Sequence, residues 1–363
     1  MPTKIIFGTG SVANLGELIG DSNSNVLLIA TKSMRKLGVV DRICSQLNVN
    51  QITIKYSSPL PSPEDVDKMV RVFKSEYCDT IIGVGGGSTI DLGKSVAAVN
   101  GSTTPTIEHI QKGLQVSENT PFYAIPTTAG TGSEVTSWAT LWDKTKHLKL
   151  SLEHESMFPT VAVIDPELTY TSPKHVSAAA GMDALTQAVE SYWSNNSQSI
   201  SDSFALNAIR CLSNNLESAC NNGEPHSKNK VAEGSLMSGL AFSNTKTTIC
   251  HSLSYPITAH YGISHGQAVA ITLAPFLEWN SIAIEEKLKD LFQAFGCNSL
   301  QTTTTKIQTL MANIGLETQL SKLGISKQGL ELILKEGFYT GRSDNNPRKV
   351  NEMDARSILE NIF

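Results

Sequence analysis

The sequence predicts an α/β domain over residues 1–170, followed by an all-helical domain over residues 171–363. Three observations lead to this expectation. Short β-rich runs alternate with helical stretches up to about residue 165, a pattern typical of a parallel sheet with helices on both faces. From about residue 172 onward, apolar residues recur at helical spacing instead. Two prolines, Pro166 and Pro173, mark the boundary between these patterns.

The elements expected in the first half follow in chain order. Strands are predicted where short apolar runs end in turns, at 25–30, 51–56, 80–84, 122–126 and 161–164. Helices are predicted at 39–47, 63–77 and 90–99. The second helix has a clear start, because Ser62 can cap it, Pro63 suits its first turn, and two acidic residues follow.

The second half shows little β-branched alternation. Long amphipathic stretches cover 176–193, 201–220 and 228–241, and the helical period continues to the last residue. We therefore expect helices throughout this half, with no second sheet.

Composition excludes several classes of protein. Hydrophobic residues make up 40% and charged residues 17% of 363 residues, which argues against a disordered chain. The net charge of −5 argues against a nucleic-acid partner. No apolar run approaches the ~20 residues that span a bilayer, so we expect no membrane association. The first residues carry no secretory pattern and the six cysteines are scattered, so we expect a cytoplasmic protein with reduced thiols.

Two small-residue turns are the first candidate functional feature. The first follows a predicted strand and includes Gly85, Gly86, Gly87 and Ser88, with Asp91 one turn into the next helix. Glycines allow close backbone approach, and the amides at a helix start suit a phosphate. The alternative is a tight strand-to-helix turn without a ligand.

The second turn follows the next predicted strand and is rich in hydroxyl groups. Its candidate residues are Thr127, Thr128, Thr131 and Ser133. Two such turns at successive strand ends favour a dinucleotide bound at the carboxyl edge of a parallel sheet. The pattern is not GxGxxG, so it is not the usual dinucleotide fingerprint.

The residues after the first predicted strand bear on the choice of dinucleotide. Thr31 and Lys32 stand where an acidic residue would bind a ribose 2′-hydroxyl. Hydroxyl groups with a nearby cation tolerate a 2′-phosphate, which favours NADP over NAD. Alternatively, Lys32 is a solvated surface charge.

A second candidate feature is a metal site in the helical half. Asp183 and Gln187 are four residues apart, so they share one helix face. One carboxylate with two imidazoles, His251 and His265, is a plausible ligand set for a divalent metal. For any single histidine, a hydrogen-bonded structural role is the alternative. His260, five residues before His265, is the other histidine of interest.

The ordered motifs resemble the iron-containing (group III) alcohol dehydrogenase family over nearly the whole chain. The motifs that carry this resemblance are FGTGS at 7–11, GVGGGSTIDLGK at 83–94, PTTAGTGSEVT at 126–136, AVIDPELT at 162–169, AAGMDALTQAVESY at 179–192 and CHSLSYPITAHYGISHG at 250–266. The resemblance implies the dehydroquinate synthase-like fold of that family, with an N-terminal nucleotide-binding domain, a C-terminal helical domain and an active site in the cleft. It also implies a homodimer.

The resemblance further implies NAD(P) as coenzyme and metal ligands at Asp183, His251 and His265. The family's remaining ligand is usually histidine, but this sequence has Gln187 there. Another family histidine is Tyr255 here. These departures leave the metal open between iron and zinc, with Gln187 or water as the fourth ligand. In the implied reaction the metal polarises a small aldehyde, hydride arrives from the coenzyme, and His260 is a candidate acid.

Other segments are similar to a subgroup associated with phosphonate metabolism, which reduces phosphonoacetaldehyde to 2-hydroxyethylphosphonate. The candidate substrate residues are Arg342, Asn346, Arg348 and Lys246. Arginine suits bidentate contact with an oxyanion. The alternative for this segment is a solvated charged patch. For the whole protein, the alternatives are a generic short-chain alcohol dehydrogenase, a metal- and NAD-dependent lyase of the same fold, and a cofactor-binding protein without turnover.

Overall fold

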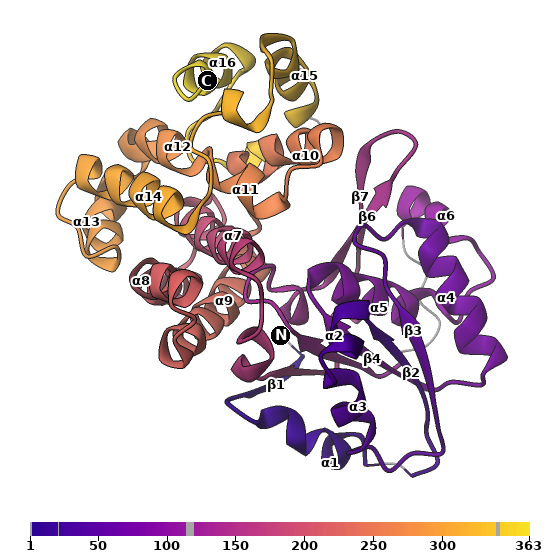
Figure 1. Ribbon diagram of the computed structural model, residues 1–363. Helices are drawn as coiled ribbons and strands as arrows, with labels where there is room; N and C mark the ends of the chain where they lie inside the picture. Colours follow the sequence, from indigo (N-terminus) through magenta and orange to yellow (C-terminus); the bar gives the residue numbers. More distant parts are fainter. Residues whose placement is uncertain (1, 21, 114–119, 339–341) are drawn as a thin grey trace. The chain divides into compact units, whose positions relative to one another are not determined.

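The computed structural model describes residues 2–20, 22–113, 120–338 and 342–363 (Figure 1). The chain divides into two compact units, which are described separately below. The first comprises residues 1–128 and 133–171, and the second comprises 129–132 and 172–363. The first is a parallel α/β unit and the second is helical, so the predicted fold class is confirmed.

The α/β unit is built on a parallel sheet. Within the described residues this sheet has six strands, in the order β1-β8-β5-β4-β2-β3. All the neighbouring pairs are parallel. The strands are β1 (Lys4–Phe7), β2 (Asn25–Ala30), β3 (Gln51–Tyr56), β4 (Thr80–Gly85), β5 (Phe122–Pro126) and β8 (Val161–Ile164).

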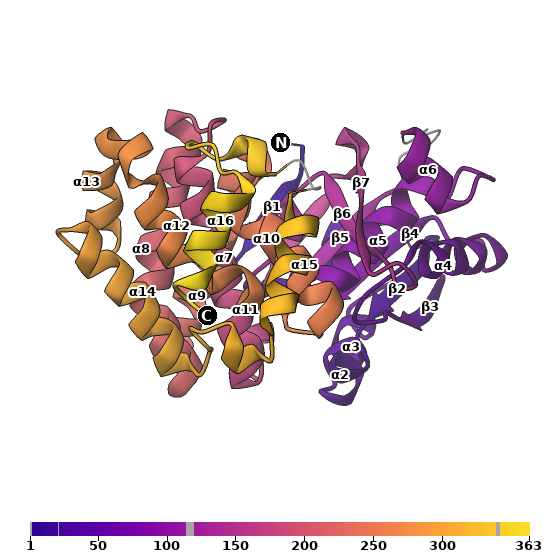
Figure 2. The ribbon, with the colours of Figure 1, turned by 90° about the horizontal axis from the view of Figure 1, so that it is seen from above.

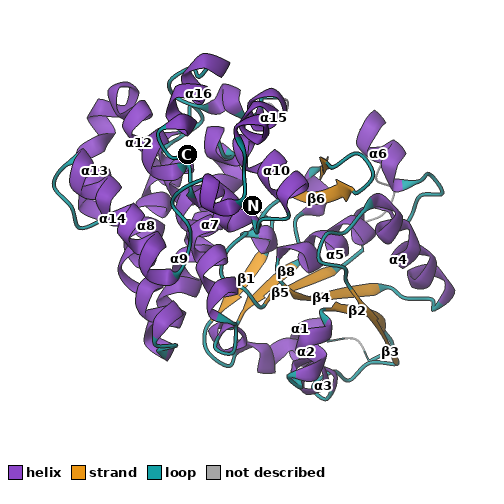
Figure 3. Ribbon diagram, turned by 45° about the horizontal axis from the view of Figure 1, so that its top comes forward, coloured by secondary structure: helices purple, strands orange, loops and turns teal. Residues whose placement is uncertain are grey.

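Both faces of this sheet are covered by helices, because the central strands are apolar on both sides. One face packs against α4 (Pro63–Ser75) and α5 (Gly87–Val99). The other packs against α1 (Leu15–Ile19), α2 (Lys32–Lys36) and α3 (Val39–Cys44), as Figure 3 shows. The helices after β2 and after β4 therefore leave on opposite faces. Such a switch point opens a crevice at the carboxyl ends of these strands.

The sequence patterns missed several elements of the α/β unit. They are the edge strand β1, the short helices α1 and α2, the helix α6 (Thr106–Lys112) and the antiparallel hairpin β6–β7 (Trp138–Asp143 and Leu148–Glu153). The hairpin turn forms because Asp143 Oδ1 accepts hydrogen bonds from the amides of Thr145 and Lys146. Predicted helix ends also shift by a few residues. For example, α5 begins at Gly87, because the glycine turn leads directly into the helix.

The helical unit is arranged around α7 (Lys174–Trp193), which is buried without interruption from Gly181 to Trp193. A helix that is buried on all sides is a core helix. It contacts α8, α9, α11 and α14. The other helices are α8 (Ser199–Asn221), α9 (Pro225–Thr245), α10 (Ile249–Tyr261), α11 (His265–Ala270), α12 (Leu273–Asn280), α13 (Glu285–Ala294), α14 (Leu300–Ile314), α15 (Lys327–Gly337) and α16 (Glu352–Glu360).

Figure 2 shows α8, α13 and α14 side by side, in agreement with their mutual contacts. These three helices cover one side of the apolar core around α7. Among the described residues, no helix combines the length and the apolar character that crossing a bilayer requires.

Candidate functional site

The first small-residue turn lies next to Thr127, the start of the second turn, in the α/β unit. β4 ends at Gly85 and Gly86 caps α5, so the first amides of α5 are free of side-chain caps. A Cβ at Gly85 would lie 2.5 Å from Thr89 Oγ1, which leaves no room for a side chain. The amide of Thr127 donates to the carbonyl of Gly85 over 2.9 Å. These turns lie beside the switch point, where a parallel sheet binds nucleotides.

Three of the other residues predicted to bind the dinucleotide, Thr31, Asp91 and Ser133, have local hydrogen-bond partners. Thr31 caps α2 by accepting from the amide of Met34 over 3.3 Å, and Lys32 is the first residue of that helix. Asp91 accepts from the hydroxyl of Ser133 and, over 2.9 Å, from the amide of Thr140. The Asp91 carboxylate therefore fixes the second turn to α5.

The glycines of the second turn have a packing role that the sequence patterns did not reveal. Residues 129–132, which include Thr131, belong to the helical unit. A Cβ at Gly130 would lie 2.8 Å from the Cβ of Ala180, and one at Gly132 would lie 2.7 Å from the Cα of Gly239. These contacts explain why glycines alternate in this segment.

A buried lysine beside these turns was also missed. Lys94 is 1% exposed, and its ammonium donates to the carbonyls of Ser133 (2.9 Å), Thr136 (3.2 Å) and Trp138. Its Nζ lies 3.5 Å from Asp91 Oδ1. Burial lowers the pKa of Lys94. The sequence clue to this buried lysine was its position, one turn after Asp91 in a helix of mostly apolar residues.

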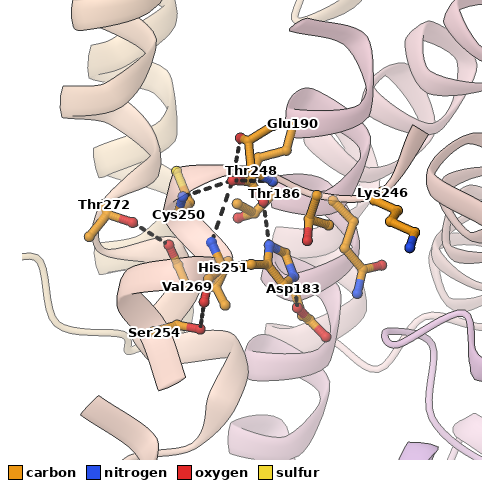
Figure 4. A network of polar contacts seen from close by, with 12 residues as sticks. Asp183, Thr186, Glu190, Lys246, Thr248, Cys250, His251, Ser254, Val269 and Thr272 are labelled. Carbon is orange, nitrogen blue, oxygen red and sulfur yellow. Dashed lines mark hydrogen bonds and ion pairs between the residues drawn. The ribbon is translucent and has the colours of Figure 1, made fainter. Parts of the chain in front are cut away.

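The three predicted metal ligands converge within the helical unit. Asp183 comes from α7, His251 from the first turn of α10, and His265 from the start of α11. One ligand atom from each lies within 4.8 Å of the others. His251 Nε2 and His265 Nε2 lie 3.4 and 3.8 Å from Asp183 Oδ1. Figure 4 shows the arrangement of Asp183 and His251.

Two atoms of this cluster are buried without a hydrogen-bond partner, namely Asp183 Oδ1 and His251 Nε2. Burying a polar atom without a hydrogen-bond partner destabilises the fold. Two such atoms facing each other therefore indicate a site for a ligand that would satisfy both. The carboxylate–imidazole donor set fits a divalent metal such as Fe²⁺ or Zn²⁺. The side chain of His265 is 32% exposed, whereas those of the other two residues are buried. The cluster therefore opens toward solvent at His265.

The electrostatics of the cluster also favour a cation. Burial by itself raises the pKa of Asp183, but the nearby His265, His251 and Gln187 reverse this effect and lower it. The carboxyl group therefore stays ionised. Burial by itself lowers the pKa of His251, but Glu190 and Asp183 outweigh it and raise the pKa to about 10. An excess of buried negative charge around one imidazole is what a bound cation would neutralise.

Gln187 and Tyr255, at positions where the resemblance implies histidines, both lie beside the ligand cluster. Gln187 is 4% exposed, its side chain lowers the pKa of Asp183, and its Oε1 lies 3.5 Å from Ser238 Oγ. The Tyr255 ring stacks on that of His265, with the centroids 5.9 Å apart and the planes 6° from parallel. His260 Nε2 instead contacts Glu336 of α15 over 2.7 Å.

Of the predicted substrate residues, two have packing partners in the C-terminal segment. Asn346 exchanges side-chain hydrogen bonds with Asn280 (2.7 and 3.0 Å). Arg348 stacks over Trp279 with its guanidinium carbon 3.4 Å from the ring centroid. These partners give both side chains a structural role.

The other two predicted substrate residues, Arg342 and Lys246, lie on loops that are joined by one side chain. Asn345 Nδ2 donates to the carbonyls of Thr245 (2.7 Å) and Thr247 (3.1 Å), the residues on each side of Lys246. The amide of Asn345 donates to the carbonyl of Arg342 over 3.1 Å. The structure therefore brings the two loops together in the helical unit.

A parallel α/β unit with a phosphate-type turn and a helical unit with a carboxylate–imidazole cluster are the parts that a metal-dependent oxidoreductase with a dinucleotide coenzyme requires. Two family models match the chain. The iron-containing alcohol dehydrogenase model matches residues 2–166, and the C-terminal model of the Fe-containing alcohol dehydrogenase family matches residues 177–363. The chain belongs to the iron-containing alcohol dehydrogenase family, and it is an oxidoreductase of the alcohol dehydrogenase class, as the sequence predicted.

Curated relatives and solved structures agree with this assignment. The chain is 30% identical over 382 residues to a 1,3-propanediol dehydrogenase of Citrobacter freundii, covering 100% of this chain and 98% of that protein. It is 33% identical over 363 residues to long-chain-alcohol dehydrogenase 1 of Geobacillus thermodenitrificans, covering 93% and 89%. A sulfoacetaldehyde reductase of Bifidobacterium kashiwanohense, solved in complex with NAD⁺, superposes with a TM-score of 0.94 at 28% identity, covering 99% and 97%.

Proposed function

We propose that the protein is a metal-dependent NAD(P)H oxidoreductase that reduces a small aldehyde to an alcohol. The observation that carries this proposal is the Asp183–His251–His265 cluster, with two buried ligand atoms that lack hydrogen-bond partners. In the α/β unit, the adjacent glycine and threonine turns at the carboxyl ends of β4 and β5 suit a dinucleotide phosphate.

Each part of the chain has a role in this proposal. Asp183, His251 and His265 would hold the metal, and a metal bound there would supply Lewis-acid polarisation of the aldehyde oxygen. The coenzyme supplies the hydride. Gln187, whose side chain lowers the pKa of Asp183, would orient that carboxylate toward the metal. His260, hydrogen-bonded to Glu336, is retained as a candidate proton donor.

For the coenzyme we propose NAD(H) as the primary dinucleotide. The methanol dehydrogenase of Bacillus methanolicus, 28% identical over 381 residues, is described as NAD-dependent, and the sulfoacetaldehyde reductase was solved with NAD⁺. No carboxylate stands at Thr31 or Lys32 to repel a 2′-phosphate, so NADPH is expected to be accepted as well. Comparison of kcat/KM for NADH and NADPH tests this, and a Lys32→Glu variant is expected to lose NADPH selectively.

For the substrate we propose a small aldehyde with an anionic group, with phosphonoacetaldehyde as the specific candidate. Sulfoacetaldehyde, the substrate in the name of a structural relative, is also a two-carbon aldehyde with a tetrahedral anion. Lys246 and Arg342, on loops joined through Asn345, are the cations that would contact such a group. The competing candidate is an uncharged alcohol or aldehyde, which the 1,3-propanediol dehydrogenase relatives favour.

Steady-state kinetics separate these candidates. We expect kcat/KM to be highest for phosphonoacetaldehyde, followed by sulfoacetaldehyde, with acetaldehyde and 3-hydroxypropanal far lower. Arg342→Ala and Lys246→Met should reduce this preference by roughly tenfold each, which corresponds to one charge-assisted contact of about 1.5 kcal/mol. Arg348→Ala, at the arginine stacked on Trp279, is the matched control and should leave the preference unchanged. Equal kcat/KM values across the four aldehydes would refute the proposal of an anionic substrate. The protein would then be a generic short-chain alcohol dehydrogenase.

The experiment for the general proposal is aldehyde-dependent oxidation of NAD(P)H with and without added Fe²⁺ or Zn²⁺. Net consumption of the reduced coenzyme distinguishes a dehydrogenase from a lyase of this fold, which would regenerate it. If the protein neither bound metal nor oxidised the coenzyme, the enzyme proposal would be wrong and the protein would be a cofactor-binding protein without turnover.

A further inference from the structure

Glu190 is a buried carboxylate whose role the sequence patterns did not reveal. It lies on α7, seven residues after Asp183, and is 0% exposed. Seven residues are two helical turns, so both carboxylates face the same side of α7. Its carboxylate accepts hydrogen bonds from the first residues of α10 and from the preceding Thr248, as Figure 4 shows.

One carboxylate oxygen of Glu190 holds the start of α10. Oε1 accepts from the amide of Thr248 (3.2 Å), from its hydroxyl (2.7 Å) and from the amide of Cys250 (2.8 Å). No side chain within α10 caps this end of the helix. An anion at a helix N-terminus satisfies amides that have no partner inside the helix. Glu190 therefore fixes the position of the turn that carries His251.

The other oxygen of Glu190 contacts the imidazole itself. Oε2 is hydrogen-bonded to Nδ1 of His251. An ionised carboxylate only accepts hydrogen bonds, so Nδ1 carries the proton. When a metal displaces the other ring proton, the lone pair is on Nε2, the buried atom that faces Asp183 Oδ1 over 3.4 Å.

The second imidazole of the cluster contacts a hydroxyl group through its Nδ1. His265 Nδ1 lies 3.4 Å from the hydroxyl of Ser254, and this hydroxyl also donates to the carbonyl of His251 over 2.7 Å. The two histidines therefore differ. His251 is held by a buried anion, and His265 has a longer contact and an exposed edge.

We propose that Glu190 is a positioning residue, which selects the Nδ1–H form of His251 and presents Nε2 to a divalent metal. This inference rests on the metal site of the proposed function. A carboxylate behind a ligating histidine fixes the ring and raises its basicity, and loss of such a partner costs roughly 10- to 100-fold in metal affinity. The same carboxylate holds the helix start, so ligand orientation and helix position are set together.

The test uses Glu190→Gln, which is nearly the same size. The amide oxygen can still accept from Thr248 and Cys250, but the amide nitrogen donates to Nδ1 and forces the proton of the neutral ring onto Nε2. Zn²⁺ affinity, measured by competition with a chelating dye, is expected to fall by roughly 10- to 100-fold. Thermal stability of the metal-free protein gives a separate readout of folding.

The matched control is Glu336→Gln, which changes the other carboxylate–histidine contact on α10, that of His260. It should leave Zn²⁺ affinity unchanged. Glu190→Asp keeps the carboxylate and should recover part of the affinity that Glu190→Gln loses.

A spectroscopic readout keeps the inference testable even if Glu190→Gln does not fold. In metal-free wild-type protein labelled with ¹⁵N-histidine, the Nδ1–H proton of His251 should give a slowly exchanging low-field signal, because it is hydrogen-bonded in a buried site. Absence of that signal, or unchanged Zn²⁺ affinity in a folded Glu190→Gln variant, would overturn the inference. Failure of the wild-type protein to bind Zn²⁺ or Fe²⁺ would instead overturn the proposed metal site.

Discussion

Replacement of Lys94 by methionine is the substitution whose cost follows most directly from the structure. The Lys94 ammonium is fully buried, donates to three backbone carbonyls and lies 3.5 Å from Asp91. Methionine fills a similar volume but donates no hydrogen bond. The carbonyls of Ser133 and Trp138 would then lose a donor, and Asp91 would lose its counter-charge.

The size of the loss can be bounded. A buried acceptor left without a partner costs about 1–3 kcal/mol, and removal of one partner from a buried ion pair costs about 3–5 kcal/mol. These contributions overlap because they share one ammonium, and the relief of lysine desolvation offsets part of them. Asp91 also keeps its hydrogen bonds from Ser133 and Thr140. We therefore expect the free energy of unfolding of the α/β unit to fall by about 3–5 kcal/mol.

Urea unfolding of the full chain measures this change, and hydrogen exchange of peptides over residues 133–143 locates it. Lys74→Met is the matched control, because the exposed Lys74 donates to a single carbonyl, that of Ser102, over 2.8 Å. It should cost less than about 1 kcal/mol. If the two variants lost the same stability, or if exchange over 133–143 did not change, the reasoning about the buried ammonium would be wrong.

Three further predictions concern pH, packing and metal. Burial raises the pKa of Glu134 from its ordinary 4.5 to about 7, so the folded state binds this proton more tightly and stability falls as pH rises from 4.5 to 7. Glu134→Gln should abolish roughly 3 kcal/mol of that fall. Urea unfolding at pH 5 and pH 8 measures it, and an equal loss of stability between the two pH values in both proteins would refute this. Gly266→Ala places a Cβ 1.8 Å from the carbonyl oxygen of Ala179, so it should cost about 3 kcal/mol or more in thermal unfolding, and a loss under about 1 kcal/mol would contradict the packing. Dialysis against a chelator should lower the Tm, and readdition of Zn²⁺ or Fe²⁺ should restore it in the wild type but not in His265→Ala; an unchanged wild-type Tm would argue against the metal site.

Local sequence patterns predicted most strands of the parallel sheet from their short apolar runs, and the start of one helix that has a clear capping sequence. The strands at 25–30, 51–56, 122–126 and 161–164 were predicted with the bounds that the structure gives them. The cap at Ser62 was also predicted, and Ser62 forms a capping box with Asp65. The hairpin β6–β7 was missed, because Trp138–Asp143 is stabilised by contacts with distant residues, including the Lys94 and Asp91 side chains of α5.

The candidate site divides in the same way. The four-residue spacing placed Asp183 and Gln187 on one helix face, and both lie on α7. No spacing rule relates Asp183 to His251 or His265, which lie on α10 and α11, so the set was predicted from the chemistry of its residue types and from the family resemblance, not from local geometry. Glu190 was overlooked because a single acidic residue in a helix is usually exposed; its burial became visible only with α10 packed against it.

The sequence alone determined the fold class, the order of the main elements and the residue types available to bind a dinucleotide and a metal, because these depend on local periodicity, turn chemistry and composition. Only the tertiary structure decided which of those residues share a site and which serve packing. Asn346 and Arg348 have partners in Asn280 and Trp279, while Glu190 supports His251. The physical reason is that hydrogen bonding and desolvation act over a few ångströms in space. They join residues that lie far apart in the chain, such as Asn280 and Asn346, which are 66 positions apart.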